Sequence, residues 1–283
     1  MKKSIKDNVH HIVYEDLKEF FTLTDGTNPP ADKHPRNTMK VKTLESRDSW
    51  TYGDDEKRKT FLEQRANPEK GKNMCADAVK KTMSQKEYKA LVEQALTYKK
   101  KLKFDDARGR LTVPRAIAGE DKYFAMRTNG SKPMVKIAIN ICGSACVGKE
   151  QFENVAKTAI PTIYALEAAG IPTEVYYCAF VNGAHDTKEF QYTATHVKVK
   201  SAQERFNWTT FAPIFCLGSY RESMFNSWWA SEYRAGDGLG RPMSSDDIEA
   251  KGNFGYTSVI GLNAVGPVDT VKTIFNNLKK ARK

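Results

Sequence analysis

Seven residues near the middle of the chain have the spacing of a phosphate-binding loop. In such a loop, backbone N–H groups and a lysine hold a polyphosphate at the start of a helix, as the run Gly143-Ser-Ala-Cys-Val-Gly-Lys149 would allow. The next residue is then Ser or Thr, whose hydroxyl ligates Mg²⁺, but this chain has Glu150. We therefore expect a degenerate loop that does not hydrolyse ATP or GTP.

A strand, a turn and a helix are needed to present this loop, and the flanking sequence predicts that order. Val135 to Ile141 is β-branched and apolar, which is typical of a strand buried on both faces of a parallel sheet. Phe152 to Ala169 has helical periodicity, and Glu174 to Val181 predicts the neighbouring strand. In such a βαβ unit, ligands bind beyond the carboxyl end of the strand, so chemistry is expected between Asn140 and Lys149.

The strand end also resembles the metal-ion-dependent adhesion site of von Willebrand factor A domains. In that site the oxygens of Asp-x-Ser-x-Ser hold a divalent ion, and Asn140-Ile-Cys142-Gly-Ser144 falls in the same register. Asn140 replaces the Asp and Cys142 replaces the first Ser, and an amide and a thiol are poor ligands for Mg²⁺. The resemblance implies the A-domain architecture with a degenerate site, so we expect no bound metal ion and no cofactor.

The resemblance extends to other segments, over roughly residues 45 to 275. These segments are similar to a family of tailed-phage proteins built on an A-domain-like Rossmann core. Within that family the chain resembles the single-stranded-DNA-binding transcription activators of podoviruses that carry a virion RNA polymerase. The resemblance implies single-stranded DNA and a phage RNA polymerase or replication protein as partners. The matching segments are Trp50-Thr-Tyr-Gly53, Val113-Pro-Arg-Ala-Ile-Ala-Gly119, Ala165-Leu-Glu-Ala-Ala-Gly-Ile-Pro-Thr-Glu-Val175 and His196-Val-Lys-Val-Lys200.

The net charge of +11 is distributed unevenly along the 283 residues. Residues 1–133 contain 29 Lys and Arg against 20 Asp and Glu, a net of +9, whereas residues 134–283 contain 16 against 14, a net of +2. Such an asymmetry favours a polyanionic partner, most often nucleic acid. A solvated surface without a specific partner is the alternative.

The densest basic segment follows a predicted helix that begins at the capping box Ser84-Gln-Lys-Glu87. We expect this segment to bind phosphates, with Tyr98 placed to stack on a base. An equally supported alternative is that the cations complement the dipole at the helix end. The candidate nucleic-acid-binding residues are Tyr98, Lys99, Lys100, Lys101, Lys103, Arg108, Arg110 and Arg115.

The composition limits the other function classes. No run of about 18 apolar residues predicts a membrane helix, and the first residues lack the apolar core of a signal peptide, so we expect a cytoplasmic protein. The five cysteines are odd in number and lie mostly in apolar segments, which indicates reduced core thiols. His185-Asp186 lies in a predicted loop near the Asn140 turn, but no nucleophile is paired with it, so no catalytic residue is expected.

Several further patterns predict elements of the fold. Ser4 to Phe21 has apolar residues three and four apart, which predicts an amphipathic helix. Phe225, Trp228 and Trp229 have helical spacing that favours the core over base stacking. Ser258 to Ala264 and Val268 to Leu278 predict a final strand and a closing helix.

Together these patterns predict an α/β fold with a three-layer, Rossmann-like sheet of von Willebrand factor A type over residues 134–283. Residues 1–133 are expected to form a basic, mostly helical region that packs on it. The leading hypothesis for function is a non-enzymatic nucleic-acid-binding accessory protein of phage transcription or replication that favours single strands. A protein-interaction adaptor with an A-domain-like fold is the second hypothesis, and a degenerate nucleotide-binding protein is the third.

Overall fold

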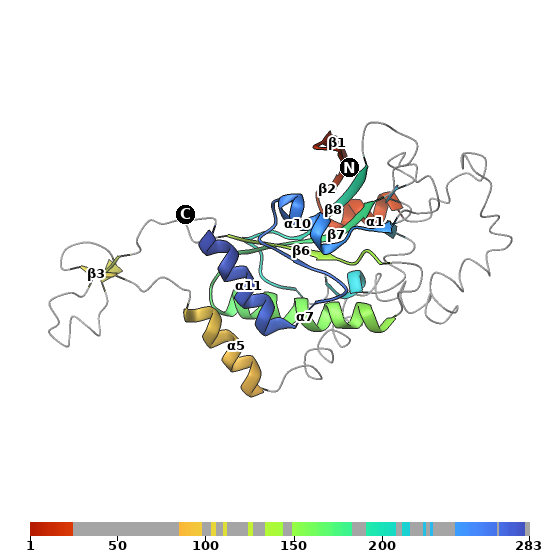
Figure 1. Ribbon diagram of the computed structural model, residues 1–283. Coiled ribbons are helices and arrows are strands. Elements are labelled where there is room, and N and C mark those ends of the chain that lie inside the picture. The colour runs from red at the N-terminus through yellow and green to blue at the C-terminus, as the bar shows by residue number, and fades with distance from the viewer. Residues whose placement is uncertain are drawn as a thin grey trace, which may run out of the picture.

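The computed structural model describes residues 1–24, 85–97, 103–105, 110–111, 124–126, 134–143, 149–182, 191–207, 211–215, 223–224, 227–228, 241–264 and 266–280. These residues form a mixed α/β fold around a seven-stranded sheet (Figure 1). Within the described part, no helix has the length and apolar character needed to span a bilayer.

The centre of the sheet is the βαβ unit that the sequence predicts. Strand β6 (Val135–Asn140) leads through helix α7 (Lys149–Ala168) to strand β7 (Thr173–Asn182), and the two strands pair in parallel. Strand β10 (Ser258–Ile260) pairs in parallel with the other edge of β6, and strand β8 (Tyr192–Lys200) pairs antiparallel with β7. The sheet is therefore mixed rather than wholly parallel.

The N-terminal hairpin completes the sheet on the far side of β8. Strand β1 (Lys2–Lys6) pairs antiparallel with β2 (Val9–Tyr14), and β2 pairs in parallel with β8. The strand order is β1-β2-β8-β7-β6-β10, and the short β9 (Arg241–Pro242) pairs with the end of β7 beyond the last residue of β6.

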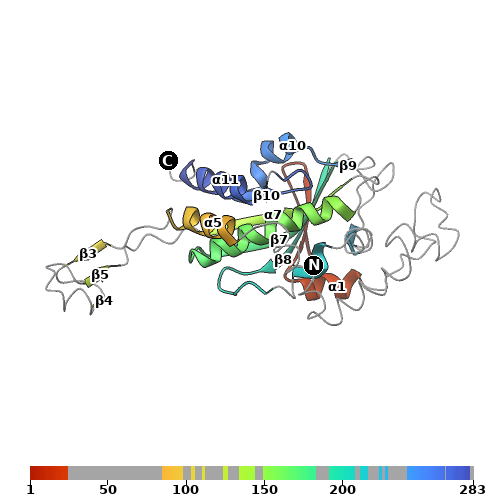
Figure 2. The same ribbon diagram turned by 90° about the horizontal axis from the view of Figure 1, so that it is seen from below.

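Helices cover both faces of this sheet and make three layers. On one face α5 (Gln85–Thr97) and α11 (Pro267–Lys280) pack against α7 (Figures 1 and 2). Helix α1 (Leu17–Thr24) adds Phe20 to the same core cluster as Ile137 and Tyr177. On the other face, a second cluster contains Phe180 and Ile248 of helix α10 (Ser245–Ala250), with the adjoining turn η4 (Gly252–Gly255) packed against it.

The predicted helix from Ser4 to Phe21 is wrong, because this segment is mostly the β1–β2 hairpin. Asp7 and Asn8 have φ angles of 50° and 63°, so both turn residues are left-handed, as in the type I′ turns that join antiparallel strands. Strand β2 is buried on both faces, with Val9 in the second cluster and Ile12 in the first. Its apolar residues therefore do not alternate, and their spacing imitates that of a helix.

The hairpin brings the first strands of the chain into the main sheet. Strands β1 and β2 belong to the sheet itself, whereas α1 packs against it. Of the remainder of the predicted N-terminal region, the structure describes α5 and a small sheet of β3 (Lys103–Asp105), β4 (Arg110–Leu111) and β5 (Phe124–Met126).

Other predicted elements are confirmed. Helix α5 begins at Gln85, the second residue of the predicted capping box, and buries Leu91, and α11 forms where the closing helix was expected. Strand β10 is present but shorter than predicted. Trp228 is fully buried, which confirms its predicted role in the core, while Phe225 and Trp229 lie outside the described residues.

Candidate functional site

The carboxyl end of β6 holds the residue that both degenerate motifs share. Asn140 is 7% exposed, and its Oδ1 accepts hydrogen bonds from the backbone N–H groups of Cys142 and Phe180, both at 3.3 Å. The amide thus turns the chain after β6 and joins it to β7. Its oxygen is directed at backbone donors, which a neutral amide satisfies without burying a charge.

Among the residues that the structure describes, the rest of the predicted loop adds few reactive groups to this site. Cys142 carries a buried thiol, and Glu150 is exposed in the first turn of α7. Lys149 begins α7, but its side chain and the whole of Ser144 lie outside the described part. In the described ranges, no three His, Cys, Asp or Glu side chains gather as metal ligands would.

The predicted nucleic-acid-binding residues fall mostly outside the description. Lys103 lies in β3 and Arg110 in β4, without described side chains. Tyr98, Lys99, Lys100, Lys101, Arg108 and Arg115 are not described, and neither are His185 and Asp186. The structure does place the helix before them, since α5 ends at Thr97, one residue before Tyr98.

A partly buried polar chain that the sequence did not reveal crosses the second face of the sheet. His11 Nδ1 lies 3.1 Å from His196 Nε2, and His196 Nδ1 lies 2.8 Å from the hydroxyl of Tyr256. The thiol of Cys178 donates to the same hydroxyl at 3.5 Å. Tyr256 can therefore donate to His196, which in turn donates to His11, so neutral groups satisfy the whole chain.

Burial keeps these groups neutral. It lowers the pKa of His196 to about 3, with a smaller contribution from His11, and it raises the pKa values of Tyr256 and Cys178. A thiol whose pKa is raised is a weak nucleophile, and an imidazole whose pKa is far below neutrality is a weak base. The polar chain therefore fixes the packing of three strands, β2, β8 and β7, and of the segment before β10, rather than carrying a reaction.

An unusual backbone turn packs over this chain of polar side chains. The four residues of η4 all have positive φ, at 60° for Gly252, 51° for Asn253, 53° for Phe254 and 78° for Gly255. Phe254 stacks on Phe180 with ring centroids 4.4 Å apart, and its ring edge meets His11 and His196. Left-handed backbone costs a non-glycine residue about 1–2 kcal/mol, so this aromatic packing holds the turn against strain.

No single pattern in the sequence could have found the polar chain. Its members come from β2, β7, β8 and the residue that follows η4, and only the strand register brings them together. The Asn-containing run between two glycines, Gly252-Asn-Phe-Gly255, was the available signal for the left-handed turn.

Comparison with known proteins identifies a family but no annotated relative. Neither the curated proteins nor the solved structures contain a match to the chain. A family model described as Domain of unknown function (DUF7192) matches residues 2–280, across the sheet, its helices and residue 133. The chain belongs to this DUF7192 family.

Proposed function

We propose that this protein is a non-enzymatic accessory protein that binds nucleic acid, favours single-stranded DNA, and recruits a partner such as a phage RNA polymerase or replication protein. The observation that carries the proposal is the charge asymmetry, with +9 in residues 1–133 against +2 in the rest. Its densest part is the basic segment Tyr98–Arg115, defined by the eight candidate residues named above. Cations in this number neutralise phosphates and release counterions.

The fold supports a binding role over a catalytic one. The position where an A domain would ligate its ion is held by Asn140, whose oxygen accepts from two backbone donors. Of the groups on the second face that could do chemistry, His196 and Cys178 are buried and His11 and Tyr256 are half-buried, and burial keeps all four neutral. We propose that the core is of the von Willebrand factor A type, and the parallel β10-β6-β7 strands with antiparallel β8 beside them support this.

Fluorescence anisotropy with a labelled single-stranded oligonucleotide, over a series of salt concentrations, tests the proposal. Replacing Lys99, Lys100, Lys101 and Lys103 together by Ala should weaken binding to all sequences. The slope of log affinity against log salt should fall by roughly 0.7 for each phosphate that the variant no longer neutralises. Lys86 and Lys89, both exposed on α5, provide a matched control whose Ala variants should bind normally.

Two results would contradict the proposal. If the wild-type protein does not bind at near-physiological salt, the adaptor hypothesis takes its place. If the fourfold variant keeps both the affinity and the salt slope, the phosphates are bound elsewhere on the chain.

A further inference from the structure

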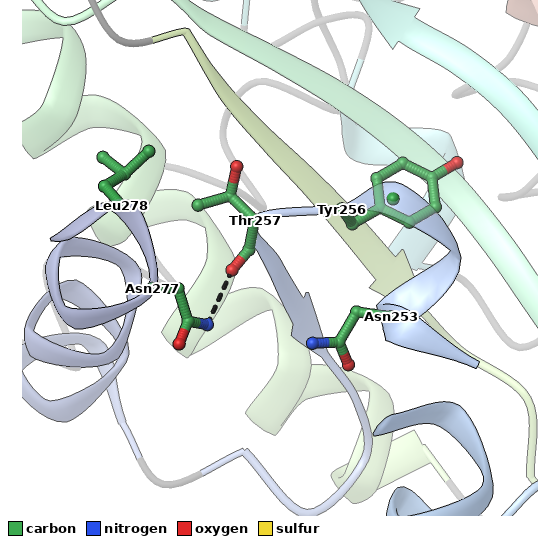
Figure 3. Close-up of a pocket in the computed structure, with 6 residues that line it drawn as sticks. Asn253, Tyr256, Thr257, Asn277 and Leu278 are labelled. Atoms are coloured by element: carbon green, nitrogen blue, oxygen red, sulfur yellow. Dashed lines mark hydrogen bonds between the residues drawn. The ribbon is translucent and has the colours of Figure 1, made fainter. Parts of the chain in front are cut away.

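A hollow of about 260 Å³ lies between η4 and the end of α11. Asn253 and Asn277 lie on opposite sides of it, with Thr257 between them (Figure 3). Asn277 Nδ2 donates to the backbone oxygen of Thr257 at 2.9 Å, which fixes the orientation of that carboxamide. The remaining lining residues are Gly255, Tyr256 and Leu278.

The left-handed turn η4 places Asn253 at this hollow. The turn holds two non-glycine residues at positive φ, and the stacking of Phe254 on Phe180 keeps it in place. Strain that the surrounding packing maintains is found most often where a side chain must be held for a ligand. A strained turn and a hollow that share one carboxamide are two separate observations that indicate a binding site.

The size and chemistry of the hollow fit a single nucleobase. Its volume is just below the range of about 300–1,000 Å³ that suits drug-sized ligands. A carboxamide both donates and accepts, as base edges do, and Asn pairs well with adenine. The hollow also lies beside the C-terminal end of α11, where the negative end of the helix dipole disfavours a phosphate but not a neutral base.

Two lysines on the second face of the sheet are linked to residues that line the hollow, Lys136 directly and Lys198 through Tyr176. Lys136 is joined to the lining residue Thr257 by two hydrogen bonds, of 3.1 and 2.8 Å, and its side chain is 42% exposed. Lys198 Nζ lies 5.9 Å from the ring centre of Tyr176, whose ring packs against Tyr256. The Glu174 carboxylate, 3.7 Å from Lys136 Nζ, offsets one of these charges.

Basic runs that follow two helices offset this negative dipole and are a second indication of a polyanion here. Helices α5 and α11 are in contact, and their C-terminal ends lie at the same end of the molecule (Figures 1 and 2). In the sequence, Tyr98 and three lysines follow α5 directly, and Lys279 to Lys283 at the end of α11 include four cations. Two basic runs distant in sequence thus start from the end of the fold that holds the hollow.

We propose that the hollow receives one base of a bound single strand, with Asn253 and Asn277 on the base edge and Lys136 and Lys198 on the flanking phosphates. This inference rests on the proposed function, and it places a base-reading site at the amino end of β6, away from the Asn140 turn. Reading of an unstacked base by side-chain amides requires a single strand, because a duplex hides that edge.

Two variants test the site with homopolymeric single-stranded oligonucleotides. Asn253→Gly removes a carboxamide while keeping the left-handed backbone, which glycine adopts without strain. Asn277→Ala removes the other carboxamide. Each should weaken binding to the preferred homopolymer roughly tenfold and narrow the difference between homopolymers. The salt slope should not change, because neither residue contacts a phosphate.

Asn276→Ala is the matched control, since Asn276 is the exposed neighbour of Asn277 on α11. This variant should bind like the wild type. The midpoint of thermal unfolding of Asn253→Gly, compared with that of the wild type, distinguishes a loss of affinity from a loss of folding. If the wild type binds single strands and both variants bind equally well, the hollow is not the site while the proposed function stands. If the wild type binds no single strand, both proposals fail.

Discussion

The side-chain oxygen of Asn140 accepts from two backbone N–H groups at 3.3 Å, at the strand end where the resemblance to A domains would place a charged ligand. Calorimetric titration with Mg²⁺ and Mn²⁺ at millimolar concentrations is therefore expected to give no binding heat. The physical reason is that an amide and a thiol, at Asn140 and Cys142, replace hard oxygen ligands. A saturable heat that disappears in Asn140→Ala would show that the site still binds an ion.

His196 leads to a prediction about acid stability. Its pKa is lowered from 6.5 to about 3 by burial, so the unfolded chain binds a proton that the folded protein excludes. This contribution to stability is complete above about pH 6.5 and is lost as the pH falls through 6.5 toward 3. The contribution of His196 to the free energy of unfolding is on the order of a few kcal/mol at most.

Urea unfolding across that pH window measures the effect. His196→Gln keeps a polar side chain but does not titrate, so its free energy of unfolding should be lower at neutral pH and should fall less steeply on acidification than that of the wild type. Carboxylates titrate alike in both proteins, so the difference between the two slopes reports His196 together with its hydrogen-bonded neighbour His11. Parallel slopes would mean that His196 is not held neutral by the fold.

At the scale of elements, the β1–β2 turn supports the whole edge of the sheet. The backbone oxygen of Asn8 accepts from the N–H groups of Gln191 and Tyr192 at 3.1 and 3.2 Å, which joins the turn to the start of β8. Asn tolerates the left-handed backbone that its φ of 63° requires, and Ala does not. The turn thus sets the register of the β1–β2 pair and its alignment with β8.

Asn8→Ala should lower the free energy of unfolding by about 1 kcal/mol, because the alanine must adopt a left-handed conformation. Asn8→Gly is the matched comparison, and it should be as stable as the wild type or more so, since Asp-Gly is a favoured type I′ turn. Equilibrium denaturation of the three proteins checks the order. If the Ala variant is the most stable of the three, the segment is helical, as its apolar spacing predicts.

The elements that were predicted correctly are those with one dominant pattern. The βαβ unit was visible because β6 and β7 are long apolar runs on either side of a periodic helix, and α5 and α11 each carry a clear apolar stripe. The hairpin was missed because β2 is buried on both faces and therefore lacks alternation. The polar chain depends on strand register, which places His11 and Tyr256 next to His196 although they are distant in the sequence.

At the scale of the whole molecule, the basic runs of the sequence begin at the end of the fold where α5 and α11 end. The basic excess lies in residues 1–133, and two basic runs follow α5 and α11 at the end where their C-termini lie (Figure 1). The opposite end of β6 holds the Asn140 turn, whose amide oxygen already accepts from the backbone. We therefore propose that this protein binds a polyanion without catalysing a reaction, at the end of the fold away from the usual position for ligands.

The most direct test compares the affinity of the wild-type protein for a single-stranded oligonucleotide with its affinity for the duplex of equal length, at near-physiological salt. Stacking on exposed bases adds on the order of 1–3 kcal/mol per base to the electrostatic attraction, and this addition does not depend on salt. We expect tighter binding to the single strand and a preference that persists as salt is raised. Equal affinity for both forms, or no binding to either, would contradict the account.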